Sequence, residues 1–161
     1  IKDSGERRTF STGSVRDVSE GKGRCDLLPL GIIGLFWSDD VLCCIEQYIR
    51  HGCLDYLWVV IKQIQQTYYP SLPDLLLDVS KHYEDGAKKY EPRNWEKGQP
   101  LSVYIDSGVR HYLKFKAGLT DEPHLRAFVW NILGAMWTHW NLPEMIDLPF
   151  KEGEHDQSVE S

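Results

Sequence analysis

The sequence predicts an all-α fold, a helical bundle of about five helices, and three observations support this. Several segments repeat apolar residues with the 3.6-residue period of a helix, and no segment shows a convincing strand pattern. The length of 161 residues suits one domain with a real core, and the 42% hydrophobic and 12% aromatic content is typical of a folded protein. The predicted domain spans 25–150, between an extended, Gly- and Ser-rich N-terminal arm at 1–24 and a disordered acidic C-terminal tail at 151–161.

Each predicted helix has a boundary signal. "SDD" places acidic residues in a first turn, Gly52 stops that helix, and "SLPD" puts Pro73 in the opening turn of a later one. "TDEP" is a restart signal before the last helix. The predicted helices span about 39–50, 54–67, the segment from Ser71 to about Tyr90, 102–116 and 123–140.

Charge and motifs exclude several function classes. The net charge of −6 and pI near 5.5 argue against stable nucleic-acid binding. The four cysteines lack zinc-site spacing and are too few for a disulfide scaffold, so we expect reduced core thiols in the cytosol. No apolar run could span a membrane and no signal-peptide core opens the chain, so a cytoplasmic protein is expected. Phosphate-loop, dinucleotide-binding and nucleophile-elbow motifs are absent, so any catalysis must be metal-assisted.

The helix ending at Tyr90 carries a glycine, Gly86, that costs roughly 1 kcal/mol relative to alanine. We expect either a close helix crossing or a ligand or metal near the backbone there. Helical spacing predicts an apolar core stripe of Leu76, Val79, Tyr83, Ala87 and Tyr90. One flank holds Asp78, His82, Asp85 and Lys89, and the other holds Ser80, Glu84 and Lys88. Glu84 and Lys88 also fit an ordinary i, i+4 ion pair.

Two further helices segregate polar side chains. The last helix has a stripe of small and polar residues that suits either a cleft floor or a close-packed crossing: His124, Ala127, Asn131, Gly134 and Thr138. In the helix before it, Asp106 and Arg110 could form only a salt bridge. Yet 81–118 carries a net +3 within a chain of −6. Converging carboxylates and basic residues suit a nucleotide phosphate site, where oxygens hold Mg²⁺ and Arg or Lys binds phosphate.

Four stretches carry a resemblance to a known family: "EGKGRCDLLPL" (20–30), "HYEDGAKKYEPRNWEKGQPLS" (82–102), "DSGVRHYLKFKAGLTDEPHL" (106–125) and "AFVWNILGAMWT" (127–138). The chain resembles the dATP/dGTP diphosphohydrolase N-terminal domain family of phages and prophages, related to the MazG-like all-α nucleoside triphosphate pyrophosphohydrolases. Residues 31–74 look like an insertion relative to that family.

The resemblance implies hydrolysis of purine deoxynucleoside triphosphates to the monophosphate and pyrophosphate, with Mg²⁺ or Mn²⁺, in a homo-oligomer in the cytoplasm, or in the host cytoplasm if the protein is phage-encoded. We expect Glu84, Asp85 and Asp106 to be catalytic metal ligands, joined by Asp121 or Glu122. The expected substrate-binding residues are Lys88, Lys89, Arg93, Asn94, Trp95, Arg110, His111, Lys114 and Asn131. Among these, Trp95 and Asn94 would contact the base, although Trp95 also suits a core anchor.

Two other functions stay open. The E-x-x-E and E-x-x-D pairs typical of MazG-like enzymes are not present as such, because Ala87 follows Glu84 by three residues. That departure favours a nucleotide-binding or sequestering module without turnover. Alternatively, the inserted helices at 39–67 recruit a protein partner, which exposed apolar surface on them would favour.

Overall fold

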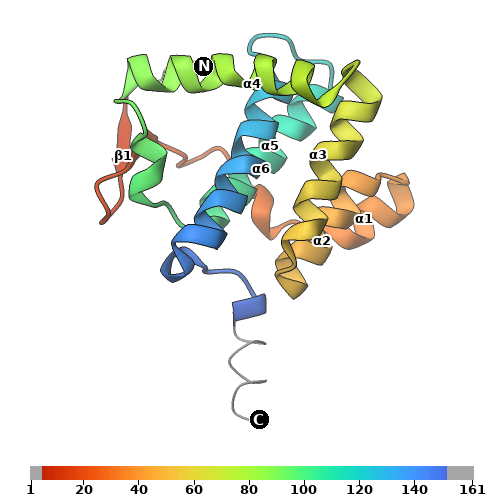
Figure 1. The fold of residues 1–161 in the computed structure, drawn as a ribbon. Helices are drawn as coiled ribbons and strands as arrows, with labels where there is room; N and C mark the ends of the chain where they lie inside the picture. Colours follow the sequence, from red (N-terminus) through yellow and green to blue (C-terminus); the bar gives the residue numbers. More distant parts are fainter. Residues whose placement is uncertain (1–4, 152–161) are drawn as a thin grey trace.

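The computed structural model describes residues 5–151, and it confirms the predicted all-α bundle. The helices are α1 Leu30–Trp37, α2 Asp40–His51, α3 Leu54–Tyr68, α4 Leu72–Lys89, α5 Leu101–Lys116 and α6 His124–Asn141 (Figure 1). Short 3-10 turns are η1 Cys25–Leu27, η2 Asn94–Lys97 and η3 Pro143–Met145, and a small sheet joins β1 Arg7–Thr9 to β2 Val15–Asp17. Residues 1–4 of the predicted arm and 152–161 of the predicted tail lie outside the described residues.

Two predicted helix starts are formed by capping side chains. Asp39 accepts a hydrogen bond from the backbone N–H of Leu42 at 3.0 Å, and Ser71 accepts one from the N–H of Asp74 at 3.2 Å. Asp39 also accepts from the Tyr112 hydroxyl at 2.6 Å, which ties the start of α2 to α5. These caps place α2 and α4 within a residue or so of their predicted starts.

Helix α1 was not predicted from the sequence. Its segment "LGIIGLFW" is apolar on every side, so it carries no helical period. Gly34 lies where α1 meets α2, and a Cβ there would come within 2.7 Å of the Cys43 sulfur. The close approach of these two helices therefore requires a glycine at this position.

The N-terminal arm forms a β-hairpin, so the prediction of an extended arm without strands is wrong. Its turn is closed by backbone hydrogen bonds between Phe10 and Ser14 and between Gly13 and Phe10, with Gly13 at φ +91°. β1 and β2 pair antiparallel in a register that sets Arg8 opposite Arg16. Strands of three residues with few apolar side chains give almost no sequence signal. The hairpin forms nevertheless, because contacts with the bundle hold it in place.

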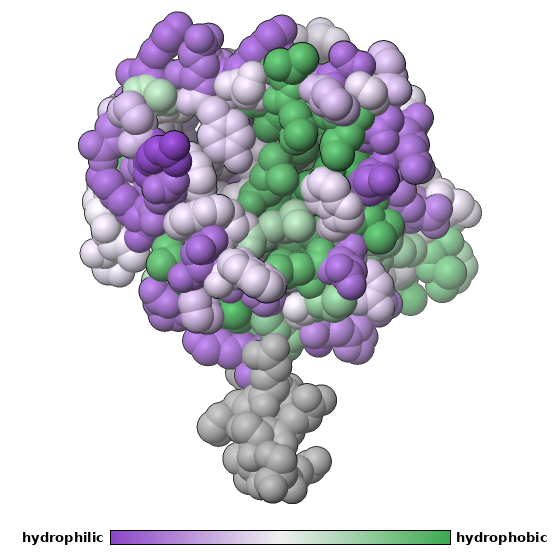
Figure 2. Space-filling view, in the orientation of Figure 1, coloured by the Kyte–Doolittle hydropathy of each residue, from purple (hydrophilic) through white to green (hydrophobic). Residues whose placement is uncertain are grey.

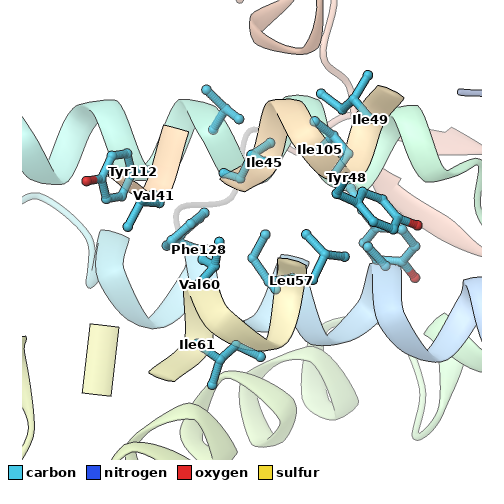
Figure 3. Packing of buried hydrophobic residues seen from close by; sticks show 14 of the residues in the cluster. Val41, Ile45, Tyr48, Ile49, Leu57, Val60, Ile61, Ile105, Tyr112 and Phe128 are labelled. Carbon is cyan, nitrogen blue, oxygen red and sulfur yellow. The ribbon is translucent and has the colours of Figure 1, made fainter. Parts of the chain in front are cut away.

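The core is built between α2, α3, α5 and α6, and the predicted insertion is part of it. Figure 3 shows Tyr48 and Ile45 of α2, Leu57 of α3, Ile105 of α5 and Phe128 of α6 meeting in one cluster, and these side chains are at most 1% exposed. Residues within 31–74 therefore share the main core rather than forming a separate unit.

The core stripe of α4 differs from the predicted one. Leu76 is 42% exposed, whereas Leu75, Val79 and His82 are buried. The run of three leucines at 75–77 allows more than one register, so the pattern alone did not select Leu75. His82, placed on a polar flank by the sequence, packs on Trp130 with ring centroids 4.9 Å apart.

Helices α5 and α6 cross closely, with a glycine on each helix. A Cβ on Gly134 of α6 would lie 2.5 Å from the Tyr104 ring of α5, and one on Gly108 of α5 would lie 3.2 Å from Asn131 of α6. The stripe on α6 that contains Asn131 and Gly134 is buried, as a close-packed crossing requires. Since Asn131 also lines the pocket described below, the stripe is both a crossing and part of a cleft wall.

Two findings bear on the predicted cellular setting. Within residues 5–151, no helix combines the length and apolar character needed to cross a membrane. None of the four cysteines forms a disulfide, as predicted. Cys53 is exposed, however, so its predicted place in the core is wrong: it immediately precedes α3 and lies outside the buried face of that helix.

Gly134 and Gly86, which both lie within helices, are expected to respond oppositely to alanine. Gly134→Ala should lower the free energy of unfolding by about 1–3 kcal/mol, because its Cβ clashes with the buried Tyr104 ring. Gly86→Ala should raise it by up to about 1 kcal/mol, because a Cβ there meets nothing within 4 Å. Urea denaturation followed by circular dichroism measures both, and effects of the same sign would contradict the described packing.

Candidate functional site

A pocket lies between the hairpin, α4, η2, α5 and α6. Its basic lining residues are Arg8, Arg16, Lys22, Arg93, Arg110 and Lys114, and its acidic ones are Asp17, Glu91, Asp106 and Glu122. The hairpin lies beside the C-terminal end of α4 (Figure 1), and this side of the molecule is mostly hydrophilic in Figure 2. Sequence segments far apart thus form one basic-rich cleft in an acidic chain.

Gly86 lines this pocket, which resolves the two interpretations of it. A close helix crossing is excluded, because no described atom lies within 4 Å of a Cβ built at Gly86. The position opens instead to the space of the cleft. The glycine therefore faces the open space of the pocket and does not lie at a helix crossing.

Asn94 holds the hairpin against the bundle. Its side-chain amide donates to the carbonyl of Val15 and accepts from the N–H of Val15, both at 2.8 Å. Gln99 donates to the Ser14 hydroxyl at 2.6 Å, and that hydroxyl donates to the Asn94 carbonyl at 3.0 Å. Both ends of the Asn94 amide are thereby used, so its expected contact with a nucleotide base gives way to a role in positioning the hairpin.

Lys89 also fastens the hairpin. Its ammonium group forms an ion pair with Asp17 at 3.1 Å, and only 10% of its side chain is exposed. Arg7 pairs with the same carboxylate at 3.0 Å. Lys89 is not among the pocket-lining residues, so the structure places it against the hairpin and not where it was expected to contact phosphate.

Asp106 and Arg110 form a part-buried ion pair at the pocket wall. Arg110 donates to Asp106 Oδ1 at 2.6 Å and to the carbonyl of Gly23 at 2.7 Å. The N–H of Cys25 donates to the same Oδ1 at 2.7 Å. The predicted salt bridge is therefore present, and it anchors the segment before η1 while leaving Oδ2 of Asp106 without a hydrogen bond among the described residues.

An acid and histidine cluster lies where α6 begins. Ligand atoms of Asp121, Glu122 and His124 lie within 4.8 Å of one another. His124 Nε2 is 2.8 Å from Asp121, and its Nδ1 is 3.0 Å from Nδ1 of His111 on α5. Glu122 and His111 line the pocket, so this cluster borders the cleft. Burial, followed by the effect of His124, lowers the pKa of His111 to about 3, so its ring is neutral at pH 7.

Other expected site residues divide into two groups. Arg93, Trp95, His111, Lys114 and Asn131 line the pocket, and Trp95 also packs edge-on against Trp137 with centroids 5.0 Å apart. Glu84, Asp85 and Lys88 are not among the lining residues. The Glu84 side chain is 67% exposed and lies 3.9 Å from Lys88, which is the ordinary i, i+4 pair. The pocket of a single chain therefore does not bring Glu84 and Lys88 to Asp106.

Sequence reasoning missed the contribution of the hairpin. Arg8 and Arg16 lie in the pocket lining although the arm carried no structural pattern. A signal did exist, since the sequence before Gly23 contains five basic residues, at Lys2, Arg7, Arg8, Arg16 and Lys22. Without the strand register, nothing indicated which of them face the bundle.

Fold and pocket together define an all-α protein with a basic-rich cleft bordered by an acid and histidine cluster. The sequence model of the family described as dATP/dGTP diphosphohydrolase, N-terminal, matches residues 61–147. The match covers 87 of 161 residues, just over half of the chain, so the chain belongs to this family. Comparison with curated proteins and with solved structures gave no match.

The matched range contains most of the site. It includes α4, η2, α5 and α6, whereas the hairpin and the stretch 20–30 lie outside it. It also begins inside the segment predicted to be an insertion, within α3.

His82 should make stability depend on pH. Burial, with smaller effects of His111 and Arg16, lowers the pKa of His82 to about 3. The unfolded chain takes up a proton near pH 6.5 and the folded protein does not, so the free energy of unfolding falls as pH drops toward 3. Between pH 7 and 5, His82 is expected to account for about 2 kcal/mol of that loss.

Urea denaturation of the wild type and of His82→Gln at both pH values measures this effect. The variant should lose about 2 kcal/mol less than the wild type over the interval. Equal losses in the two proteins would mean that His82 is protonated in the folded state.

Proposed function

We propose that the protein hydrolyses purine deoxynucleoside triphosphates, dGTP or dATP, to the monophosphate and pyrophosphate. The observation that carries the proposal is the cleft itself, which sets basic side chains beside the Asp121, Glu122 and His124 cluster. The family description, which names dATP and dGTP diphosphohydrolases, supports the choice of substrate. Free cysteines and the nucleotide pool both fit a cytoplasmic setting.

Asp121, Glu122 and His124 suit a divalent cation, Mg²⁺ or Mn²⁺. Their two carboxylates and one imidazole nitrogen come within 4.8 Å of one another, and oxygen with nitrogen donors suits these ions, Mn²⁺ in particular. Such a cation supplies charge neutralisation at the phosphates and lowers the pKa of bound water. This assignment keeps the expected ligands Asp121 and Glu122, adds His124 and leaves out Glu84 and Asp85. Asp106, also expected as a metal ligand, becomes the metal-free base instead.

Residues of the cleft have distinct proposed roles. Arg110 and Lys114 bind phosphate oxygens, and Trp95, with Trp130 and Tyr83 nearby in the lining, offers aromatic faces to the base. Water attacks the phosphorus atom of the α-phosphate. The bond between that phosphorus and the oxygen that bridges the α- and β-phosphates breaks, and pyrophosphate departs with the bridging oxygen. Asp106 accepts the proton from that water through Oδ2, which has no competing hydrogen bond in the described part of the chain.

Turnover tests this proposal. Pyrophosphate release is measured from the four deoxynucleotides and their ribose counterparts, with Mg²⁺ or Mn²⁺, for the wild type, Glu122→Gln and Glu84→Gln. We expect metal-dependent turnover of dGTP or dATP, reduced about 100-fold or more in Glu122→Gln, because several kcal/mol of charge stabilisation is lost. Glu84→Gln should stay close to the wild type, because Glu84 is exposed outside the pocket.

The same assay separates the alternatives. Loss of activity in Glu84→Gln with retention in Glu122→Gln would restore the metal site expected from the sequence. Tight binding of a nucleotide without turnover would favour the sequestering module, which the missing E-x-x-E pair also favours.

We also propose that the protein is a homo-oligomer. Large apolar side chains are exposed on η1 and α1: Leu27, Ile32, Leu35, Phe36 and Trp37. Hydrophobic surface gathers at the lower right of Figure 2, where Figure 1 places α1. Contiguous exposed apolar residues of this kind are typical of a protein interface, and a second copy fits the expectation from the family.

Sedimentation velocity checks the oligomer. The wild type is expected to sediment above the 18.7 kDa monomer, and Phe36→Glu should shift it toward the monomer, because Phe36 is 82% exposed and its loss harms no core. Leu77→Glu is the matched control on α4, with Leu77 68% exposed. A wild-type monomer would contradict the proposed homo-oligomer.

A further inference from the structure

The register of the hairpin sets two arginines against each other. Arg8 lies directly opposite Arg16, whereas the neighbouring pair, Arg7 and Asp17, has opposite charges and forms an ion pair at 3.0 Å. Directly opposed residues project to the same side of a sheet, and like charges there are destabilising. Both arginines line the pocket, so the repulsion is directed into the cleft.

Arg16 is surrounded by neutral partners. Its Nε donates to the Gln99 side-chain oxygen at 2.8 Å, and both terminal nitrogens donate to the Asn131 side-chain oxygen at 3.2 Å. The guanidinium also lies over the rings of Tyr104 and Trp130, 5.1 and 5.3 Å from their centroids. No carboxylate in residues 5–151 forms an ion pair with it. A buried guanidinium whose direct hydrogen-bond partners are all neutral suits a bound anion.

Arg8 and Arg110 each present an unsatisfied donor. Arg8 donates one hydrogen bond, to the Ser19 hydroxyl at 2.8 Å, and its Nε is buried without an acceptor. Arg110 binds Asp106 and the Gly23 carbonyl through one terminal nitrogen, and its Nε is likewise buried without an acceptor. Buried N–H groups without partners are uncommon in folded proteins, so two around one pocket indicate a missing ligand.

The acidic residues of the lining do not supply that anion. Asp17 is paired with Lys89, Asp106 with Arg110, and Glu91 with Lys97. The pocket lining has six basic residues and four acidic ones, which are these three and Glu122. Among residues 5–151, neither hairpin arginine forms a direct ion pair, and Asp106, whose charge acts on both arginines, is already paired with Arg110.

We infer that Arg8 and Arg16 of the hairpin, with Arg110 of α5, form a subsite for the phosphate groups of the nucleotide, and that the hairpin is a wall of the binding site. This inference rests on the proposed function for the identity of the ligand. Guanidinium groups suit it because their planar forks donate paired hydrogen bonds to phosphate oxygens. Gln99 and Asn131 set the orientation of Arg16 without neutralising it.

Calorimetric titration of the full chain with sodium pyrophosphate, in EDTA so that no metal contributes, tests the subsite. The wild type is expected to bind, and Arg8→Gln and Arg16→Gln should each weaken binding about tenfold or more, because each removes a charge-assisted contact. Arg50→Gln is the matched control, since it removes the same charge from an exposed position on α2 outside this pocket and should change affinity less than twofold. Arg16→Lys should also weaken binding, because the ammonium group lacks the planar fork.

The outcomes separate the subsite from the proposed activity. Absence of pyrophosphate binding to the wild type, or equal weakening by Arg50→Gln and Arg8→Gln, overturns the subsite. If Arg16→Gln does not fold, Arg8→Gln decides, because Arg8 makes a single side-chain hydrogen bond. Pyrophosphate binding that needs Arg8, without turnover of any nucleotide, contradicts the activity and supports the subsite. Nucleotide turnover by the wild type, together with unchanged pyrophosphate affinity in Arg8→Gln, supports the activity and contradicts the subsite.

Discussion

The close crossing of α5 and α6 is the constraint on which the rest of the structure depends. Gly134 admits the Tyr104 ring and Gly108 admits Asn131, so each helix receives a side chain of the other. This approach brings Asp106, Arg110 and His111 of α5 to the same wall as Asn131 and the cluster at the start of α6. Any larger residue at the crossing would move these groups apart, because the interior is close-packed.

The cleft becomes a site only when the hairpin is added. Asn94 binds both backbone groups of Val15, and Lys89 binds Asp17, so η2 and the end of α4 hold the hairpin in place. The sequence suggested Asn94 and Lys89 as substrate contacts. In the structure they instead position the hairpin, which carries two arginines of the pocket lining. Side-chain hydrogen bonds to the bundle hold the hairpin in place, because a sheet of two three-residue strands is too small to be stable by itself.

Much of the bundle could be predicted from the sequence, because helical period and capping residues are local signals. The starts of α2 and α4 follow from Asp39 and Ser71. Helix α1 and the register of α4 could not be predicted, since an all-apolar segment and the leucines at 75–77 have no unique buried face. Asp106, Arg110 and Glu122, which the sequence suggested by their chemistry, do line the pocket. The hairpin arginines were missed, because their place depends on contacts across some 80 residues of sequence.

Hydrogen–deuterium exchange of residues 7–17, with and without dGTP and Mg²⁺, tests most directly whether the hairpin and bundle form one binding site. These amides belong to a sheet of only two three-residue strands, so in the free protein they should exchange faster than those of α5. A ligand that bridges the hairpin and α5 should slow exchange in both segments together. Slower exchange in α5 with no change in residues 7–17 would contradict the account, because the ligand would then bind the bundle without the hairpin.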